Sequence, residues 1–164
     1  MNLKDMICQS DYFDLITTEK HFIDRDFNFP SKNQSITLDA EDEENNNYKV
    51  DINRKRAIIT RCTYLERHPI NNVLLRLDID TKPHRNPHTS EVIGGNHIHI
   101  YTNDYGDSIA VELDDPILKI INPNFDINRF NIDIKNENRL YAYFEAFSDF
   151  CNIKNIPIYQ FSLS

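Results

Sequence analysis

Glycine is scarce in this sequence. Three of the 164 residues are glycine, far below the average of roughly 7%, so turns that need positive φ fall mostly to the plentiful asparagine and aspartate. Three cysteines, Cys8, Cys62 and Cys151, are an odd number without a short spacing. No apolar run approaches the roughly 20 residues of a membrane span, and no leader-like segment opens the chain. These absences predict a cytoplasmic protein with reduced thiols and no membrane partner.

Acidic residues outnumber basic ones, and the net charge is −8. Such a balance disfavours a global attraction to nucleic acid or to an anionic membrane. The charges are unevenly spread, however. Residues 54–85 hold eight basic and three acidic side chains, a net charge of +5, which leaves −13 for the rest of the chain. One face of the protein can therefore be basic although the whole is acidic.

The pattern of apolar residues predicts an α+β fold in one domain over residues 1–164. Alternation indicates strands, most clearly over 73–80, and helical spacing indicates helices at 10–23 and 137–151 with a shorter one near 117–121. We expect an antiparallel sheet of about five strands, with the N-terminal and C-terminal helices packed on one face. The expected strands are 48–54, 57–66, 73–80, 97–101 and 108–113.

This domain divides into three parts along the chain. Residues 1–47 are expected to hold the first helix and an acidic loop over 39–47, whose run of charges indicates a solvated surface. Residues 48–113 supply the sheet core, and residues 114–164 supply an irregular connection and the C-terminal helix. The tail after Ile156 is expected to be extended, either paired with the sheet edge or packed beside the last helix.

One stretch, residues 78–107, concentrates the histidines and the glycines. It holds four of the six histidines and all three glycines, namely His84, His88, His97, His99, Gly94, Gly95 and Gly106. A loop over 81–95 is expected between two strands, and it is longer than the roughly two to five residues of an ordinary hairpin connection. Loops of this length are usually functional or disordered, so this stretch marks the candidate site.

The strands on either side of the loop place polar side chains on one face. Residues two apart in a strand share a face, so His97, His99 and Tyr101 are expected to project together. By the same alternation, Arg76 and Asp78 stand on the open face of the preceding strand. If the two strands pair, the imidazoles face the guanidinium of Arg76.

Residues of the loop itself are expected to bind the substrate at the rim of this face. His84, Arg85 and Asn86 supply polar groups there. Gly94 and Gly95 come directly before the second strand, and the absence of a side chain would let the backbone approach a ligand closely.

Three kinds of chemistry fit this arrangement. The first is metal-independent cleavage of RNA, in which one histidine deprotonates the ribose 2′-hydroxyl, a second histidine or Tyr101 protonates the leaving oxygen, and Arg76 or Arg85 stabilises the phosphorane. The second is a metal centre, with the H-x-H pair and either His84 or Asp78 as third ligand. The third is a polar face that binds a protein or a nucleic acid and catalyses nothing.

The first of these is favoured. Histidine suits both proton-transfer roles because its pKa is roughly 6.5. No E-x-x-H or C-x-x-C motif accompanies the histidine pair, so no metal and no cofactor is predicted. The predicted catalytic residues are His97, His99, Arg76 and Tyr101, and the predicted substrate-binding residues are His84, Arg85, Asn86, Gly94 and Gly95.

Three blocks of the chain carry a resemblance to a known family. The blocks LLRLDI at 74–79, HRNP at 84–87 and HIHIY at 97–101 resemble a group of small uncharacterised bacterial proteins, often found on mobile elements and prophages. The match extends over 73–113, and it departs at 88–90, where the group carries an aspartate-glycine. The resemblance implies no particular activity. The habitat of the group implies conflict biology: a toxin, an abortive-infection component or an inhibitor of host defence.

Two functions are therefore expected as alternatives. The first is a small cytosolic toxin or defence-related effector that cleaves RNA through the paired histidines. The second is a non-enzymatic inhibitor from a phage or mobile element, whose acidic surface over 39–44 would occupy a nucleic-acid groove of its target. The expected partners are RNA or a protein, either an antitoxin or a defence-complex target, and the sequence leaves the oligomeric state open.

Overall fold

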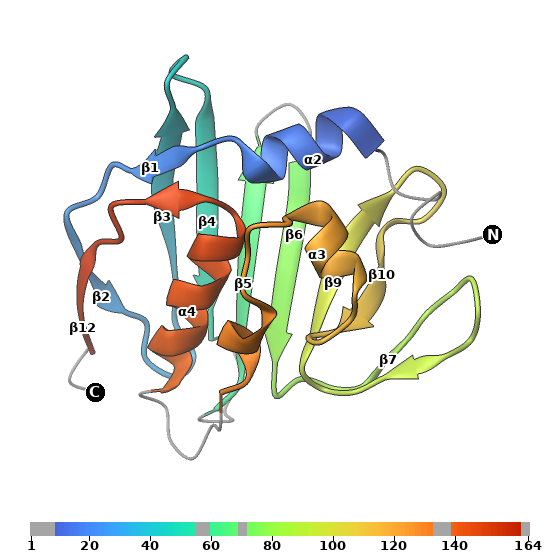
Figure 1. Ribbon diagram of the computed structural model, residues 1–164. Coiled ribbons are helices and arrows are strands. Elements are labelled where there is room, and N and C mark those ends of the chain that lie inside the picture. Colours follow the sequence, from blue (N-terminus) through green and yellow to red (C-terminus); the bar gives the residue numbers. More distant parts are fainter. Residues whose placement is uncertain (1–8, 55–59, 69–71, 133–138, 162–164) are drawn as a thin grey trace.

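An eight-stranded sheet forms the centre of the protein (Figure 1). The computed structural model describes residues 9–54, 60–68, 72–132 and 139–161. In chain order the strands of the sheet are β1 (Lys20–Phe22), β3 (Ser35–Asp42), β4 (Asn47–Asn53), β5 (Cys62–His68), β6 (Asn72–Ile79), β9 (His97–Thr102), β10 (Gly106–Glu112) and β11 (Ile153–Lys154). Across the sheet they run β10-β9-β6-β5-β4-β3-β1-β11. Every neighbouring pair is antiparallel except β1 and β11.

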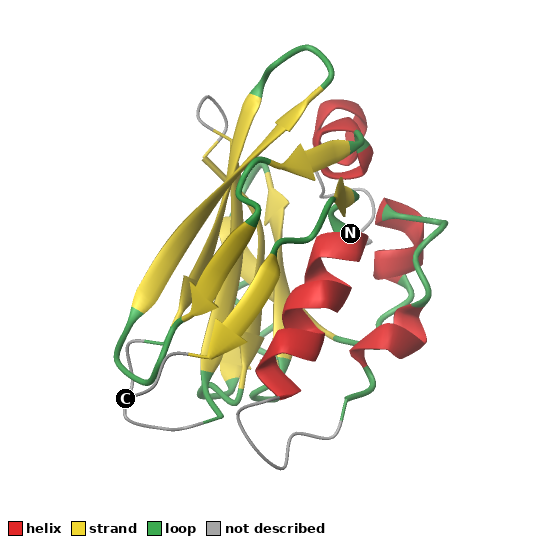
Figure 2. Ribbon diagram, turned by 90° about the vertical axis from the view of Figure 1, so that its left-hand side faces the viewer, coloured by secondary structure: helices red, strands yellow, loops and turns green. Residues whose placement is uncertain are grey.

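The remaining elements are helices and two small ladders. The helices are α2 (Gln9–Thr17), α3 (Ile117–Ile121), the 3₁₀ helix η1 (Ile127–Phe130) and α4 (Arg139–Phe150). The ladders pair β2 (Asp26–Phe29) with β12 (Ile158–Phe161) and β7 (His84–Arg85) with β8 (Val92–Ile93). Figure 2 shows the helices together on one side of the sheet. The expected α+β class is confirmed, but the expected strand count of about five is wrong, because eight strands pair in the part of the chain described.

The core lies between the sheet and these helices. The Tyr64 hydroxyl of β5 donates to the Leu140 carbonyl of α4 at 2.5 Å, and its ring lies 6.1 Å from the ring of Phe147. The Tyr12 hydroxyl of α2 donates to the Leu74 carbonyl of β6 at 2.8 Å. Because side chains alternate along a strand, residues next to such core positions, for example Thr63 beside Tyr64, point to the opposite, helix-free face.

The N-terminal third contributes more strands than the sequence indicates. The expected helix over 10–23 is too long: α2 ends at Thr17, and Lys20–Phe22 forms β1. The expected acidic loop over 39–47 is wrong as well, since β3 continues to Asp42 and β4 begins at Asn47. The expected limits of the sheet, 48–113, are therefore too narrow.

The acidic residues of β3 explain the second error. Leu38 and Ala40 are buried, whereas the intervening Asp39 and Glu41 are half-buried on the open face, so a strand with one charged face resembles a loop in composition. The carboxylate of Asp42 then accepts hydrogen bonds from the backbone N–H groups of Glu44 and Asn46, which closes the turn into β4.

The C-terminal half follows the sequence pattern more closely. The short helix expected near 117–121 is α3, and the helix expected over 137–151 is α4, with residues 133–138 outside the described part. The strand expected over 57–66 begins at Cys62. Residues 55–59 also lie outside the described part of the chain. The tail forms β12, which pairs with β2 rather than with the large sheet, and Tyr159 stacks on Tyr141 of α4 with ring centroids 3.4 Å apart.

Two of the three cysteines lie in the core. Cys62 and Cys151 are free thiols and fully buried. Burial raises the pKa of Cys62 to about 12, which keeps its thiol protonated and unreactive. Cys8 lies outside the described residues. Among the helices of the described chain, none has the length and apolar character that a membrane crossing requires.

Candidate functional site

The long loop over 81–95 is closed at its base and fastened to strand β10. The backbone N–H and the hydroxyl of Thr81 both donate to the Gly95 carbonyl, at 3.0 and 3.1 Å. Between these ends, β7 and β8 form a two-stranded hairpin. His84 donates from Nε2 to the Ser108 carbonyl at 2.6 Å, because a carbonyl oxygen can only accept. The loop is therefore ordered by specific polar contacts.

Asn86 makes the strongest attachment of this loop. Its side-chain Nδ2 donates to the Ala110 carbonyl, and its Oδ1 accepts from the Ala110 N–H, both at 2.8 Å. The residue is buried, with 3% of its surface exposed. Asn86 thus supports the loop instead of facing the pocket, and its expected part in substrate binding stays a prediction.

Strands β6 and β9 bring the polar residues of the two strands together. Their antiparallel register sets Arg76 opposite His99 and Asp78 opposite His97. These side chains share the helix-free face, since Leu77 and Ile98 between them belong to the core. Here they line a pocket of about 740 Å³. Its wall consists of Asn53, Arg54, Arg61, Thr63, Arg76, Asp78, Thr81, Lys82, Pro83, His84, His97 and His99.

The rings of His97 and His99 converge on one carboxylate. His97 Nε2 lies 3.1 Å from Asp78 Oδ2, and His99 Nε2 lies 3.3 Å from the same oxygen. The opposite nitrogens face backbone carbonyls, His97 Nδ1 at 2.5 Å from Gly94 O and His99 Nδ1 at 2.9 Å from Asp107 O. Both histidines are 1% exposed, and all four of their ring nitrogens contact polar groups.

Three further residues, Arg76, Thr63 and His84, complete the contacts of this cluster. Arg76 Nη2 lies 2.8 Å from His99 Nε2, and Arg76 Nε lies 3.4 Å from Asp78 Oδ1. The Thr63 hydroxyl donates to Asp78 Oδ1 at 2.9 Å. The ring of His84 lies 4.7 Å from that of His99, centroid to centroid. Asp78, His97 and His99 each offer one donor atom within 4.8 Å of the others, so they could hold a metal ion.

The surroundings shift the pKa of two of these groups. Burial by itself would raise the pKa of Asp78, but the contacts with His97 and His99 and the charge of Arg76 outweigh it and hold the pKa well below its usual range. Burial lowers the pKa of His99, Asp78 opposes this, and the charge of Arg76 adds to the lowering. The carboxylate is thus ionised and the His99 ring is neutral near pH 7.

Not every residue expected at the site lies in this pocket. The alternation predicted that Tyr101 projects with His97 and His99, but it does not line the pocket: its ring lies 6.3 Å from that of Tyr12 on α2, and its expected catalytic part stays a prediction. The reason is that the β6–β9 ladder ends at the pair Leu75–Ile100, beyond which the Tyr101 N–H donates to the Tyr12 hydroxyl at 3.2 Å. Arg85 donates to the Ser90 carbonyl within the loop and does not line the pocket either.

Other residues of the pocket wall were not among the expected site residues. Arg54, Arg61, Lys82 and Thr63 line it. The three cations belong to the basic stretch 54–85, so their clustering in the sequence was the signal that could have identified them. Thr63 carries no such signal, because its place beside Asp78 depends on the β5–β6 register.

The close packing of the backbone requires a glycine at position 95. A Cβ atom at this position would lie 2.5 Å from the carbonyl oxygen of Thr81, which is backbone and has little freedom to move. At Gly94 the nearest atoms to such a Cβ are the Glu112 carboxylate oxygens at 3.9 Å, an ordinary contact. The expected approach of both glycines to a substrate stays a prediction.

This difference gives a test of the loop base. Gly95→Ala should lower the free energy of unfolding by about 1–3 kcal/mol, because the methyl group pushes Thr81 and Gly95 apart. Gly94→Ala is the matched control and should change it by less than about 0.5 kcal/mol. Urea unfolding of both variants measures the difference, and equal stability of the two would contradict the close contact.

Fold and site together define an α+β protein that presents a pocket of histidines and cations on the helix-free face of an antiparallel sheet. The chain belongs to the family of unknown function DUF6978, which matches residues 7–153. No curated protein and no solved structure matches it. The expected membership of an uncharacterised family is therefore confirmed, and the bacterial and prophage habitat stays a prediction.

Proposed function

We propose that this protein is a small cytosolic effector, of the toxin or defence-related kind, that binds and cleaves RNA at the histidine pocket. One observation carries the proposal: the pocket wall combines cationic side chains with imidazoles. These are Arg54, Arg61, Arg76 and Lys82 together with His84, His97 and His99. Among the described residues that form this wall, Asp78 is the one carboxylate.

The charge of the pocket favours a phosphate ligand. Four basic residues and one carboxylate line the pocket, although the whole chain carries a charge of −8. Of the four, Arg54 is buried and donates to the Pro30 carbonyl. A cleft lined by one sign of charge concentrates ligands of the opposite sign. Arg76 is 33% exposed and offers a planar fork of N–H groups, which suits two oxygens of a phosphodiester.

RNA is favoured over DNA by the chemistry that the pocket can support. The ribose 2′-hydroxyl lies beside the phosphate and can attack it, so the protein needs to orient the phosphate, neutralise its charge and activate the hydroxyl. Arg76 supplies the neutralising charge. An imidazole helps either by moving a proton or by holding a cation, and both roles place His97 and His99 beside the reacting phosphate.

The proposal is tested with purified protein and a mixture of structured and unstructured RNA. Wild type should shorten the RNA, and His97→Ala/His99→Ala should cut at least about 100-fold more slowly. His21→Ala/His88→Ala removes two imidazoles outside the pocket wall and is the matched control, expected to cut like wild type. Intact RNA after incubation with folded wild type would reject the enzyme.

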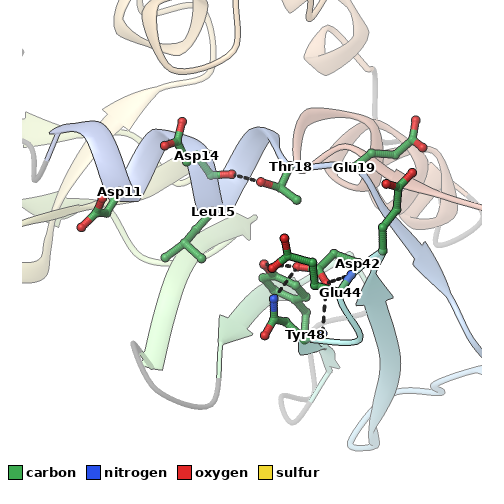
Figure 3. Close-up of a pocket in the computed structure, with 10 residues that line it drawn as sticks. Asp11, Asp14, Leu15, Thr18, Glu19, Asp42, Glu44 and Tyr48 are labelled. Carbon is green, nitrogen blue, oxygen red and sulfur yellow. Dashed lines mark hydrogen bonds between the residues drawn. The ribbon is translucent and has the colours of Figure 1, made fainter.

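A second function, inhibition of a defence protein, is favoured by a different surface. Helix α2 and the β3–β4 turn lie on either side of a hollow, as Figure 3 shows. Its volume is about 620 Å³. Six of its lining residues are acidic: Asp11, Asp14, Glu19, Asp42, Glu43 and Glu44. All but Asp42 are exposed, so this surface suits a basic groove on another protein. RNA left intact by wild type would favour this function over the first.

A further inference from the structure

We propose that Asp78, His97 and His99 form a binding site for a divalent first-row transition metal ion, with zinc as the reference ion. The site itself is argued from geometry and does not depend on the proposed function. The role of the bound ion in RNA cleavage does rest on the proposed function. The sequence favoured a metal-independent reaction, and the contacts of the two rings are the reason to depart from it.

Two of the three separations between the donor atoms match those around a metal ion, and all three atoms lie within 4.8 Å of one another. The Asp78 oxygen lies 3.1 Å from His97 Nε2 and 3.3 Å from His99 Nε2. Ligands at roughly 2.0–2.1 Å from one ion, at angles between octahedral and tetrahedral, lie roughly 2.9–3.4 Å from one another. A small shift of the rings is therefore enough to accept an ion at their common point.

The outer contacts fix the rings in the orientation that a metal needs. Backbone carbonyls of Gly94 and Asp107 can only accept, so His97 and His99 each carry a proton on Nδ1. In a neutral ring the Nε2 lone pair then points at Asp78. A histidine ligand usually donates its other N–H to a carbonyl or carboxylate in this way.

The carboxylate is held in the same manner. The Thr63 hydroxyl donates to Asp78 Oδ1 at 2.9 Å, which leaves Oδ2 directed at the two histidines. All three residues thus have one atom fixed by a neighbour, and their remaining donor atoms lie within 4.8 Å of one another.

The contact between His97 and Asp78 needs a positive charge between its atoms. A neutral His97 ring with its proton on Nδ1 brings a lone pair to 3.1 Å from a carboxylate oxygen, and two lone pairs at that distance repel. Either a proton on Nε2 or a metal ion removes the repulsion. The metal ion is favoured because His99 Nε2 also lies 3.3 Å from the same oxygen, so one ion can contact all three donor atoms, whereas a proton on His97 serves one contact.

Arg76 competes with the ion. Its Nη2 lies 2.8 Å from His99 Nε2, where it donates to the lone pair that the metal would take. The side chain is 33% exposed, and Asp107 Oδ2 lies 3.8 Å from Arg76 Nη1, so the guanidinium has a second carboxylate to turn to. Replacing Arg76 should consequently strengthen metal binding, whereas a role limited to supporting the histidines predicts a loss.

The donor set selects the class of metal. Two imidazole nitrogens and one carboxylate suit zinc or iron(II). Magnesium and calcium are disfavoured, because they prefer oxygen ligands. Three protein ligands leave at least one coordination position open, as catalytic metal sites do. Under the proposed function, that position would receive a phosphate oxygen of the RNA, with Arg76 beside it.

The site is tested by direct metal binding. Tag-free full chain, freed of metal with EDTA and then of EDTA by dialysis, is titrated with zinc by calorimetry and with cobalt(II) by visible absorption. Wild type should bind one ion, and His97→Ala, His99→Ala and Asp78→Asn should each abolish that binding. Thr63→Val, which loses the hydroxyl behind Asp78, should weaken binding by about 10- to 100-fold. Arg76→Gln should tighten it.

The control variant is His21→Ala, because His21 and Glu41 form an exposed pair that could collect metal weakly. It should bind like wild type. Absence of zinc and cobalt binding by folded wild type would overturn the site, as would binding that survives both His97→Ala and Asp78→Asn. If His97→Ala fails to fold, as judged by circular dichroism, the near-isosteric Asp78→Asn and Thr63→Val decide the question.

RNA cleavage separates the two proposals. Cleavage by wild type that persists in EDTA, with no metal bound, would reject the metal site and leave the RNA-cleaving effector in place. Stoichiometric zinc binding with no cleavage of RNA would reject the RNA-cleaving effector and leave the metal site in place. Cleavage that EDTA stops and zinc restores would support both.

Discussion

Replacing Glu66 by alanine is expected to lower the free energy of unfolding by about 3–5 kcal/mol. Glu66 and Lys20 are both fully buried, and Lys20 Nζ lies 3.2 Å from Glu66 Oε2. Lys20 also donates to the carbonyls of Leu15 and Ile16 at the end of α2, at 2.7 and 3.0 Å. Without Glu66 the ammonium loses its counter-charge in a site that water does not reach, which is the costly case for a buried pair.

A double-mutant cycle isolates the contribution of this pair. Lys20→Met should be as costly as Glu66→Ala, since it leaves a buried carboxylate and two helix-end carbonyls without their partner. Lys20→Met/Glu66→Ala should cost less than the sum of the single changes, because no charge remains.

The exposed pair Lys49–Asp39 is the matched control. Its atoms are closer, at 2.6 Å, but its side chains are 38% and 42% exposed. Lys49→Met should cost at most about 1 kcal/mol. Urea unfolding followed by circular dichroism measures all four variants, and additive single and double changes at Lys20 and Glu66 would show that the two charges do not interact.

Asn86→Ala is expected to cost about 2–4 kcal/mol, because it leaves the buried N–H and carbonyl of Ala110 without partners. The change should also release the loop over 81–95 from β10 and speed hydrogen exchange at the Ala110 amide. Asn86→Asp keeps the acceptor for the Ala110 N–H but sets an oxygen against the Ala110 carbonyl, so it should be destabilising too.

Asn103, exposed in the turn between β9 and β10, provides the control for this change. Asn103→Ala should stay within about 0.5 kcal/mol of wild type. Urea unfolding and amide exchange measure both variants. An Ala110 amide that exchanges equally slowly in wild type and Asn86→Ala would contradict the assignment of its protection to Asn86.

Strict alternation is what made part of this fold predictable. In β6 and β9 buried aliphatic residues alternate with polar ones, so the strands and the face of their polar residues follow from the order of residues. The buried aliphatic residues are Leu75, Leu77 and Ile79 in β6 and Ile98 and Ile100 in β9. Strand β1 has three residues, too few for a period to appear, and its identity depends on pairing with β3 and β11. Lys20 and Glu66 are buried charges, and nothing local in the sequence distinguishes them from surface residues.

The candidate site was also predictable only in part. Alternation placed His97, His99, Arg76 and Asp78 on one face, but it did not give the register that sets the pairs opposite each other. The convergence of two rings on a single oxygen is a consequence of that register. The role of Asn86 could not be predicted either. The HRNP block indicates a turn, but the partner of the Asn86 side chain lies 24 residues away in the chain.

The bidentate contact of Asn86 affects whether a strand of another molecule can pair with the edge strand β10. Ala110 is opposite His99 in the ladder, yet its N–H and carbonyl bond to Asn86, so they point away from β9. The Ser108 carbonyl, two residues earlier, is occupied by His84. The side chains of Asn86 and His84 thus occupy the backbone groups of β10 with which an incoming strand would pair. The outer edge of β10 is therefore protected from strand addition and from aggregation by edge-to-edge pairing.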